Sequence, residues 1–166
     1  MPYPPMSLRL ETARLTLRPW TESVVEAHRM LVAERGDGMP STEHNRRMIE
    51  EQRSASALTG IALLAVVRRD AGDFIGYCGL TVGRASVDEP EIAYELFRRV
   101  HGQGYATEAA FAVLDAATTT GRKRLWATVR PWNAPSFRVL EKLGFERDHV
   151  SADGRDELVW LTRCLS

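Results

Sequence analysis

Apolar residues recur along the chain with two periodicities, which divide it into strand and helix segments. Alternation at every second residue, as at Leu15 and Leu17 around Thr16, is typical of a strand with one buried face. Apolar positions spaced three and four residues apart are typical of a helix that packs on one side. By these criteria the predicted strands are residues 10–18, 61–67, 74–82, 91–97, 125–129, 145–150 and 157–164. The predicted helices are residues 24–32 behind an N-cap at Thr21, 41–53, 105–119 and 133–143.

Turn residues between these segments indicate how the strands are connected. Residues 70–73 (Asp-Ala-Gly-Asp) and 153–154 (Asp-Gly) are typical of the turns of two hairpins. Strands that follow one another predict antiparallel pairing, whereas the β–α–β passage over residues 91–129 predicts one parallel pair. The sequence thus predicts a single α/β (α+β) domain over residues 8–166, with a mixed, mostly antiparallel sheet of about six to seven strands and about four helices. Residues 1–7, with three prolines, are predicted to form a flexible N-terminal arm.

A glycine-rich turn joins a predicted strand to a predicted helix. It comprises His101, Gly102, Gln103, Gly104, Tyr105, Ala106 and Thr107. Small residues at this place let the backbone approach a ligand closely. The first amide groups of the helix have no partner inside it, and together with the helix dipole they suit phosphate or diphosphate. Taken alone, the segment is equally compatible with a bare structural turn.

The turn differs from two other nucleotide-binding motifs. A P-loop needs Gly-Lys-Ser/Thr, which does not follow here. A dinucleotide fingerprint needs a third glycine where Thr107 stands. It also needs an acidic residue at the end of the next strand, where this chain has Val129 and Arg130.

A second segment, from Asn133 to Phe145, combines a helix with two polar residues near its start. Asn133 can cap the helix, Leu140 can face the core, and Gly144 can end the helix. These roles do not account for Ser136. It lies one helical turn from Asn133 and presents a second hydrogen-bonding group on the same face.

Composition and charge narrow the classes of protein. The 166 residues are 44% hydrophobic and 27% charged, which is ordinary for a globular domain. Because 22 Lys+Arg balance 22 Asp+Glu, the chain lacks the basic surplus typical of nucleic-acid or anionic-membrane binding. The longest apolar run, residues 61–67, is too short to cross a bilayer.

The cysteines, the histidines and the N-terminal residues add three expectations. We see no secretory leader pattern and expect a cytoplasmic protein. In a reducing compartment Cys78 and Cys164, each inside an apolar run, are expected to be buried free thiols, with one long-range disulfide as the alternative. The histidines are scattered, so no metal site is predicted.

Together the glycine turn and the segment over residues 133–145 resemble the coenzyme A site of the GNAT superfamily of N-acetyltransferases. The turn resembles the family's Gln/Arg-x-x-Gly-x-Gly/Ala motif, with His101 where Gln or Arg is usual. The second segment resembles its Asn-x-x-Ser-x-x-x-x-x-Lys-x-Gly-Phe motif. Residues 10–19 and 91–96 are similar to strands of the RimJ/RimL-type branch, although Phe97-Arg98-Arg99 replaces a proline turn common there.

The resemblance implies direct transfer of an acetyl group from acetyl-CoA to a primary amine, without an acyl-enzyme. The amine would belong to a protein N-terminus or to a small molecule. The residues implied to bind the coenzyme are Tyr94, Leu96, His101, Gly102, Gln103, Gly104, Tyr105, Ala106, Thr107, Asn133 and Ser136. Ser136 is also the candidate proton donor to the departing sulfur, and Glu91 is the candidate base, acting through water.

Other interpretations stay open at this point. Glu91 can be a solvated carboxylate at a strand edge and Ser136 a surface helix residue, while Glu95 and Tyr94 are rivals for the base and donor roles. The alternative function is a catalytically silent acyl-CoA-binding sensor on the same fold, and an unrelated phosphate-binding or interaction module is a third. The sequence does not specify the acceptor amine. The family resemblance favours a homodimer.

Overall fold

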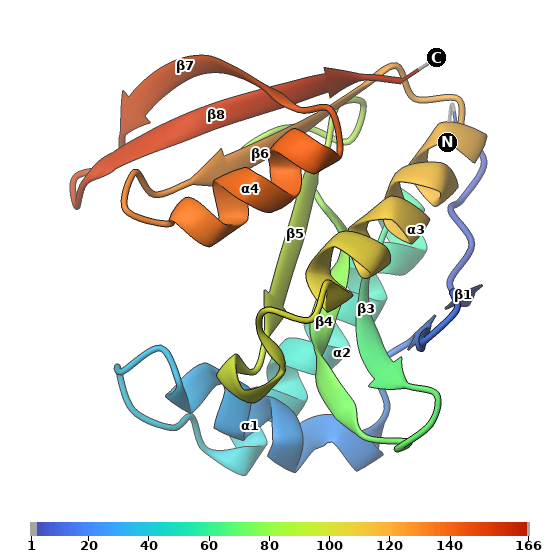
Figure 1. Ribbon diagram of the computed structural model, residues 1–166. Coiled ribbons are helices and arrows are strands. Elements are labelled where there is room, and N and C mark those ends of the chain that lie inside the picture. Colours follow the sequence, from blue (N-terminus) through green and yellow to red (C-terminus); the bar gives the residue numbers. More distant parts are fainter. Residues whose placement is uncertain (1–2, 166) are drawn as a thin grey trace.

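Eight strands form one mixed sheet in the computed structural model, which describes residues 3–165. Their order across the sheet is β1-β2-β3-β4-β5-β6-β8-β7 (Figure 1). All neighbouring strands are antiparallel except β5 and β6, which are parallel. The strands are β1 (Leu10–Glu11), β2 (Leu15–Arg18), β3 (Leu63–Arg68), β4 (Phe74–Thr81), β5 (Glu91–Leu96), β6 (Arg124–Val129), β7 (Glu146–Ala152) and β8 (Glu157–Cys164).

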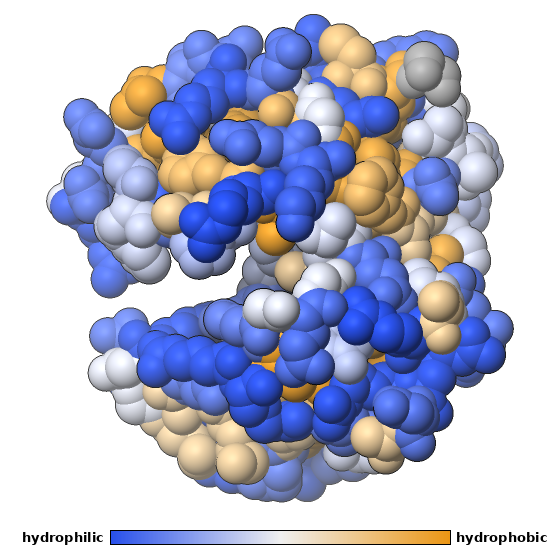
Figure 2. Space-filling view, in the orientation of Figure 1, coloured by the Kyte–Doolittle hydropathy of each residue, from blue (hydrophilic) through white to orange (hydrophobic). Residues whose placement is uncertain are grey.

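The parallel pair of strands separates soon after it forms. β5 pairs along its whole length with β4, but with β6 it shares only the register pair Glu91 and Trp126. Beyond that point β6 diverges from β5 and carries β7, β8 and α4 (Ala134–Lys142) away from the rest of the sheet (Figure 1). The molecule therefore has two lobes, and Figure 2 shows a deep cleft between them.

The β4–β5 loop, residues 82–90, joins the two lobes near this single register pair. The carbonyl of Pro90 accepts a hydrogen bond from the Trp126 backbone N–H at 2.9 Å. The indole N–H of Trp126 donates to a Glu89 carboxylate oxygen at 2.9 Å. The carbonyl of Val87 accepts from the Arg122 guanidinium at 2.8 Å. Side chains and loop carbonyls thus supplement the sparse backbone pairing.

Helices cover the sheet and supply the walls of the cleft. α3 (Tyr105–Thr119) lies along β4, β5 and β2 and buries small side chains, including Ala109, Ala110 and Val113, which allow close packing. α1 (Val25–Ala33) and α2 (Thr42–Thr59) pack on each other at the far end of the lower lobe in Figure 1. Two short 3-10 helices, η1 (Glu22–Val24) and η2 (Arg98–Val100), complete the described helical elements. Within residues 3–165, no helix combines the length and apolarity needed to span a membrane.

The fold matches the predicted class, with one more strand than expected. The single strand predicted over residues 10–18 is wrong, because it is split into β1 and β2, which pair with each other. Glu108 of α3 explains the split: its carboxylate accepts hydrogen bonds from the Thr12 hydroxyl and the Arg14 backbone N–H, and so fixes the turn between the strands. The second helix begins behind Ser41 as predicted but runs on to Thr59.

Two further expectations concern the N-terminal arm and the cysteines. Residues 1–2 of the predicted arm lie outside the described residues, as does Ser166. Met6 is only 2% exposed, belongs to the core cluster, and donates its backbone N–H to the Gly60 carbonyl at 2.9 Å. Both cysteines are free, but only Cys78 is buried, because Cys164 at the end of β8 is exposed.

Replacing Ile75 with alanine should lower the free energy of unfolding by about 2–5 kcal/mol. Ile75 lies in β4 at the centre of the sheet and is fully buried, so truncation leaves a cavity as well as losing apolar burial. Urea unfolding measures the change. Val150→Ala is the control, because Val150 is 56% exposed on the edge strand β7 and should change stability by less than about 0.5 kcal/mol.

Candidate functional site

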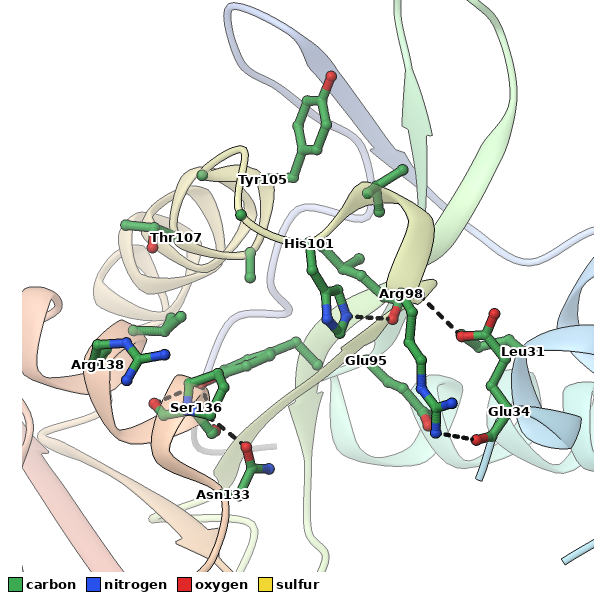
Figure 3. A pocket seen from close by; sticks show the side chains of 18 of the residues that line it. Leu31, Glu34, Glu95, Arg98, His101, Tyr105, Thr107, Asn133, Ser136 and Arg138 are labelled. Carbon is green, nitrogen blue, oxygen red and sulfur yellow. Dashed lines mark hydrogen bonds between the residues drawn. The ribbon is translucent and has the colours of Figure 1, made fainter. Parts of the chain in front are cut away.

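A large cavity lies beside β5, where β5 has separated from β6. Its volume is about 790 Å³, and its walls come from β5, the turn before α3, α3 and α4 on one side and the end of α1 on the other. Figure 3 shows side chains from these elements converging on it. Every residue predicted to bind the coenzyme lines this cavity, except Gln103.

The glycine turn places the start of α3 at the wall of this cleft. Gly104 is the N-cap and Gly102 lies two residues earlier, with φ values of +81° and +77°, which favour glycine. No side chain caps α3. The first amide groups of the helix, at Tyr105, Ala106 and Thr107, therefore have no partner within the helix, and these residues line the cleft. This arrangement suits an anion such as a diphosphate.

The free edge of β5 forms the floor of the cleft. Backbone groups of a strand point alternately to its two neighbours. Since the N–H of Phe97 bonds to β4, at the Ile75 carbonyl, the backbone groups of Tyr94 and Leu96 point the other way, toward the gap. An extended chain with amide groups could pair with this edge as an added strand does.

His101 reaches back from the glycine turn to this edge. Its Nε2 lies 2.9 Å from the carbonyl oxygen of Leu96 (Figure 3). A carbonyl oxygen can only accept, so the ring donates Nε2–H. The Leu96 carbonyl is therefore engaged within the protein, while the carbonyl and N–H of Tyr94 and the N–H of Leu96 remain directed at the gap.

Tyr94 and Ser136 meet where β5 faces α4. The Tyr94 hydroxyl lies 2.9 Å from Ser136 Oγ and 3.2 Å from the Ser136 carbonyl oxygen. Burial raises the pKa of Tyr94 to about 12, so its hydroxyl keeps its proton at neutral pH. Asn133 caps α4 by accepting the Ser136 N–H at 3.3 Å, which fixes the backbone of the serine. Ser136 is half-buried, lines the cavity, and is thus more than a surface helix residue.

Glu91 lies in a second, smaller cavity of about 250 Å³. Tyr94, Asn133 and Ser136 line both cavities, so the two meet at these residues. Glu91 is 5% exposed, and its carboxylate accepts hydrogen bonds from the Arg84 backbone N–H and from the Thr128 hydroxyl, the latter at 2.6 Å. It is therefore not a solvated carboxylate at a strand edge.

Two arginines that line the second cavity, Arg84 and Arg130, both form ion pairs with Asp153. Asp153, in the β7–β8 turn, accepts hydrogen bonds from Arg130 at 2.6 Å and from Arg84 at 3.3 Å. The Arg130 guanidinium holds the pKa of the Asp153 carboxyl well below its usual range. The β4–β5 loop and the β7–β8 turn are thereby tied together beside Glu91.

Several charged residues of the cleft were missed by the sequence reasoning. Arg35, two residues after the end of α1, binds Glu95 of β5 with an Nε–Oε2 distance of 2.9 Å, so the predicted rival base is in an ion pair. Arg138 and Lys142, one helical turn apart on α4, line the wall opposite α1. The four-residue spacing of Arg138 and Lys142 was the one sequence pattern that could have indicated a basic helix face. The Arg35–Glu95 pair has no such pattern, because the two residues are 60 positions apart. No group of three or more metal-ligating side chains occurs in the described chain.

A comparison of the sequence with protein-family models identifies the domain. Residues 14–146 match the model of the acetyltransferase (GNAT) domain, which is most of the chain. The chain belongs to the GNAT acetyltransferase family. Its glycine turn, the separated strands β5 and β6, and α4 are therefore parts of a GNAT domain.

One curated relative resembles part of this GNAT domain. The uncharacterized N-acetyltransferase p20 of Bacillus licheniformis is 32% identical over 97 residues, which are 55% of this chain. The alignment spans 54% of that relative, so about half of its length is matched.

Solved structures share the GNAT fold over nearly the whole chain. A putative GNAT-family acetyltransferase from Bordetella pertussis has a TM-score of 0.84 at 22% identity, covering 95% of this chain and 99% of that one. Mycobacterium smegmatis RimJ, solved in complex with CoA-disulfide, has a TM-score of 0.76 at 24% identity, covering 90% and 81%. At these identities the likeness establishes the fold.

Proposed function

We propose that this protein is an acetyl-CoA-dependent N-acetyltransferase that moves the acetyl group directly to a primary amine. The observation that carries the proposal is the cleft at the β5–β6 separation. It connects the uncapped start of α3, the free edge of β5 and the Tyr94–Ser136 pair in one continuous cavity.

The lining of this cleft fits the parts of coenzyme A. The amides from Gly102 to Thr107 would hold the diphosphate, since a Cβ at Gly102 would meet nothing within 4 Å and the turn is open to a ligand. The edge of β5 at Tyr94 and Leu96 would bond the amides of the pantetheine arm. Arg138 and Lys142 add positive charge beside a ligand that carries several phosphates.

Acetyl-CoA supplies an acetyl group that is already activated as a thioester. The protein's task is then to place the amine beside it and to manage protons. Neither cysteine lines the cleft, and burial raises the pKa of the Cys78 thiol, so neither is suited to carry the acetyl group. These features favour direct transfer over an acyl-enzyme.

Two residues have proposed roles in proton movement. Ser136 can donate a hydrogen bond to the departing sulfur, with its hydroxyl oriented by Tyr94. Glu91 can accept the proton of the attacking amine through water. Glu91 lines the smaller cavity, which meets the cleft at Ser136. A terminal α-amine, with a pKa near ~8, loses its proton more easily than a lysine near ~10.4. This favours an α-amine or another weakly basic primary amine as acceptor.

Location and assembly rest on resemblance to the RimJ/RimL-type branch. We propose a cytoplasmic protein that forms a homodimer, with either a protein N-terminus or a small-molecule amine as acceptor. The domain would be a single GNAT unit from residue 8 onward.

Two measurements test the proposed function. Titration calorimetry with acetyl-CoA should show binding, and an assay for free thiol should show coenzyme A release when a panel of peptides and small amines is added. Binding without acetylation of any amine would instead indicate an acyl-CoA sensor. If acetyl-CoA does not bind, both assignments fail.

Replacing Glu91 with glutamine should lower amine acetylation at least about tenfold without changing the affinity for acetyl-CoA. The carboxamide oxygen of glutamine can accept the Arg84 N–H, and its NH2 group can donate to the Thr128 hydroxyl, but glutamine cannot take up a proton. Steady-state rates and calorimetry separate the two effects. Glu89→Gln in the same loop is the control, because its amide oxygen can still accept from Trp126 and the rate should stay at the wild-type level. A wild-type rate in Glu91→Gln would assign the base role to another group.

A further inference from the structure

The second ring nitrogen of His101 is free to meet a ligand. Nε2 is held by the Leu96 carbonyl. The two nitrogens of an imidazole point in nearly opposite directions, so Nδ1 faces away from Leu96. Figure 3 shows the ring inside the cleft, between the start of α3 and the end of β5, and His101 is one of the residues that line it.

The bond to Leu96 decides what Nδ1 can do. With Nε2–H donated to a carbonyl, the neutral ring carries only a lone pair at Nδ1. That nitrogen becomes a hydrogen-bond donor when the ring takes up a proton, which also gives the ring a positive charge. The fixed ring thus has two states that differ in their attraction for an anion.

The charged side chains that line the cleft suit an anionic ligand. The charged side chains that line the same cleft are Glu34, Arg35, Glu95, Arg98, Arg138 and Lys142. The Arg14–Glu108 ion pair adjoins Gly104 on the β2 side of α3. Four basic groups against two acidic ones leave a positive surplus in the cleft. Among side-chain types, imidazole is the one with an ordinary pKa near ~6.5, well apart from the ordinary pKa values of carboxylates, lysine and arginine.

We propose that His101 is a titrating ligand of the coenzyme diphosphate. Its ring takes up a proton at Nδ1 when the diphosphate binds, and Nδ1–H then donates a hydrogen bond to a phosphate oxygen. The inference rests on the proposed function, because it needs the diphosphate at the start of α3. The proton comes from solvent, and no covalent bond changes. His101 stands only three residues before the N-cap of α3, so it is placed beside the amides proposed to hold the same group.

The sign of the pH dependence follows from linkage. A ligand that favours the protonated ring binds most tightly where the ring is protonated. Affinity is therefore full at acidic pH and falls as pH rises through the titration of the ring in the complex. Glutamine, the residue common at this position in the family motif, can donate a hydrogen bond but gains no charge, so it should remove this dependence.

The test is calorimetric titration with 3′-dephospho-coenzyme A between about pH 5.5 and about pH 8.5, on either side of the ordinary imidazole range. This probe is chosen because its diphosphate stays fully ionised over that range and it lacks the terminal phosphate, which titrates. We expect wild-type affinity to fall about fivefold to tenfold across the range, since a tenfold loss is the most that a ring can cause when binding raises its pKa by about one. In His101→Gln the affinity should be flat. His44→Gln, at an exposed position of α2, should behave as the wild type.

A second readout uses the wild-type protein alone. Binding heats measured near neutral pH in two buffers of different ionisation enthalpy give the protons taken up, and we expect net uptake. Pantetheine, which lacks the diphosphate, should cause none. Equal pH profiles in wild type and His101→Gln, or binding without proton uptake, would overturn the role of His101 while leaving the coenzyme site intact. Absence of binding at every pH would instead contradict the proposed function.

Discussion

Replacing Gly104 with glutamate should weaken coenzyme A binding at least about a hundredfold, because a carboxylate would enter the proposed diphosphate site. Gly104 is the N-cap of α3, with φ at +81°, and its neighbours supply the free amide groups of the cleft. A side chain here adds like charge beside the diphosphate and can compete for the same amides. Calorimetry with coenzyme A measures the loss.

The two ends of α3 provide a matched control. Gly121, just beyond the C-terminal end, has φ at +82°, and like Gly102 it would place a new Cβ in open space. Gly121→Glu therefore carries the same backbone strain and the same added charge away from the proposed site. It should fold with a similar loss of stability and bind coenzyme A as the wild type does. If Gly104→Glu also binds normally, the diphosphate does not lie at the start of α3.

Removing the Ser136 hydroxyl should reduce turnover about a hundredfold, with the affinity for acetyl-CoA changed by less than about threefold. Ser136 lies where the two cavities meet, and its hydroxyl is the proposed donor to the departing sulfur. Alanine leaves the α4 backbone and the Asn133 cap in place. The measurement is kcat for amine acetylation beside a binding titration.

A double-mutant cycle with Tyr94 tests whether the pair acts as a unit. Tyr94→Phe removes the hydroxyl that lies 2.9 Å from Ser136 Oγ. If tyrosine acts by orienting the serine, Tyr94→Phe should cost less than Ser136→Ala, and the double variant should be no slower than Ser136→Ala alone. Ser54→Ala, in an exposed turn of α2, is the control for the serine substitution. Fully additive losses would mean that the two hydroxyls act independently.

Local sequence patterns predicted the elements better than their pairing. The Ser41 cap, the Asn133 cap and the two hairpin turns each depend on residues a few positions apart, and each was found in the structure. The division of residues 10–18 into two strands depends on Glu108, which lies 94 positions from Arg14. A pattern within one segment cannot predict a contact with a residue so far away in the sequence.

The same limit applies to the candidate site. The glycine turn and the Asn133–Ser136 spacing were visible because each lies within one short segment. The separation of β5 from β6 has no local signature, and it decides that Tyr94 faces Ser136, 42 positions away. It also places Glu91 in a second cavity rather than on the wall of the main cleft. The bond from His101 to Leu96 spans only five residues, but it depends on the end of β5 being free of a neighbour.

The contrast between the two cysteines has a practical consequence. Cys78 is sealed inside β4, and burial raises its pKa, so alkylating reagents meet little thiolate there. Cys164 is exposed at the end of β8, on the lobe that β6 carries away from the rest of the sheet. A maleimide-linked fluorophore would therefore attach at a single known point of the native chain, without any engineered thiol.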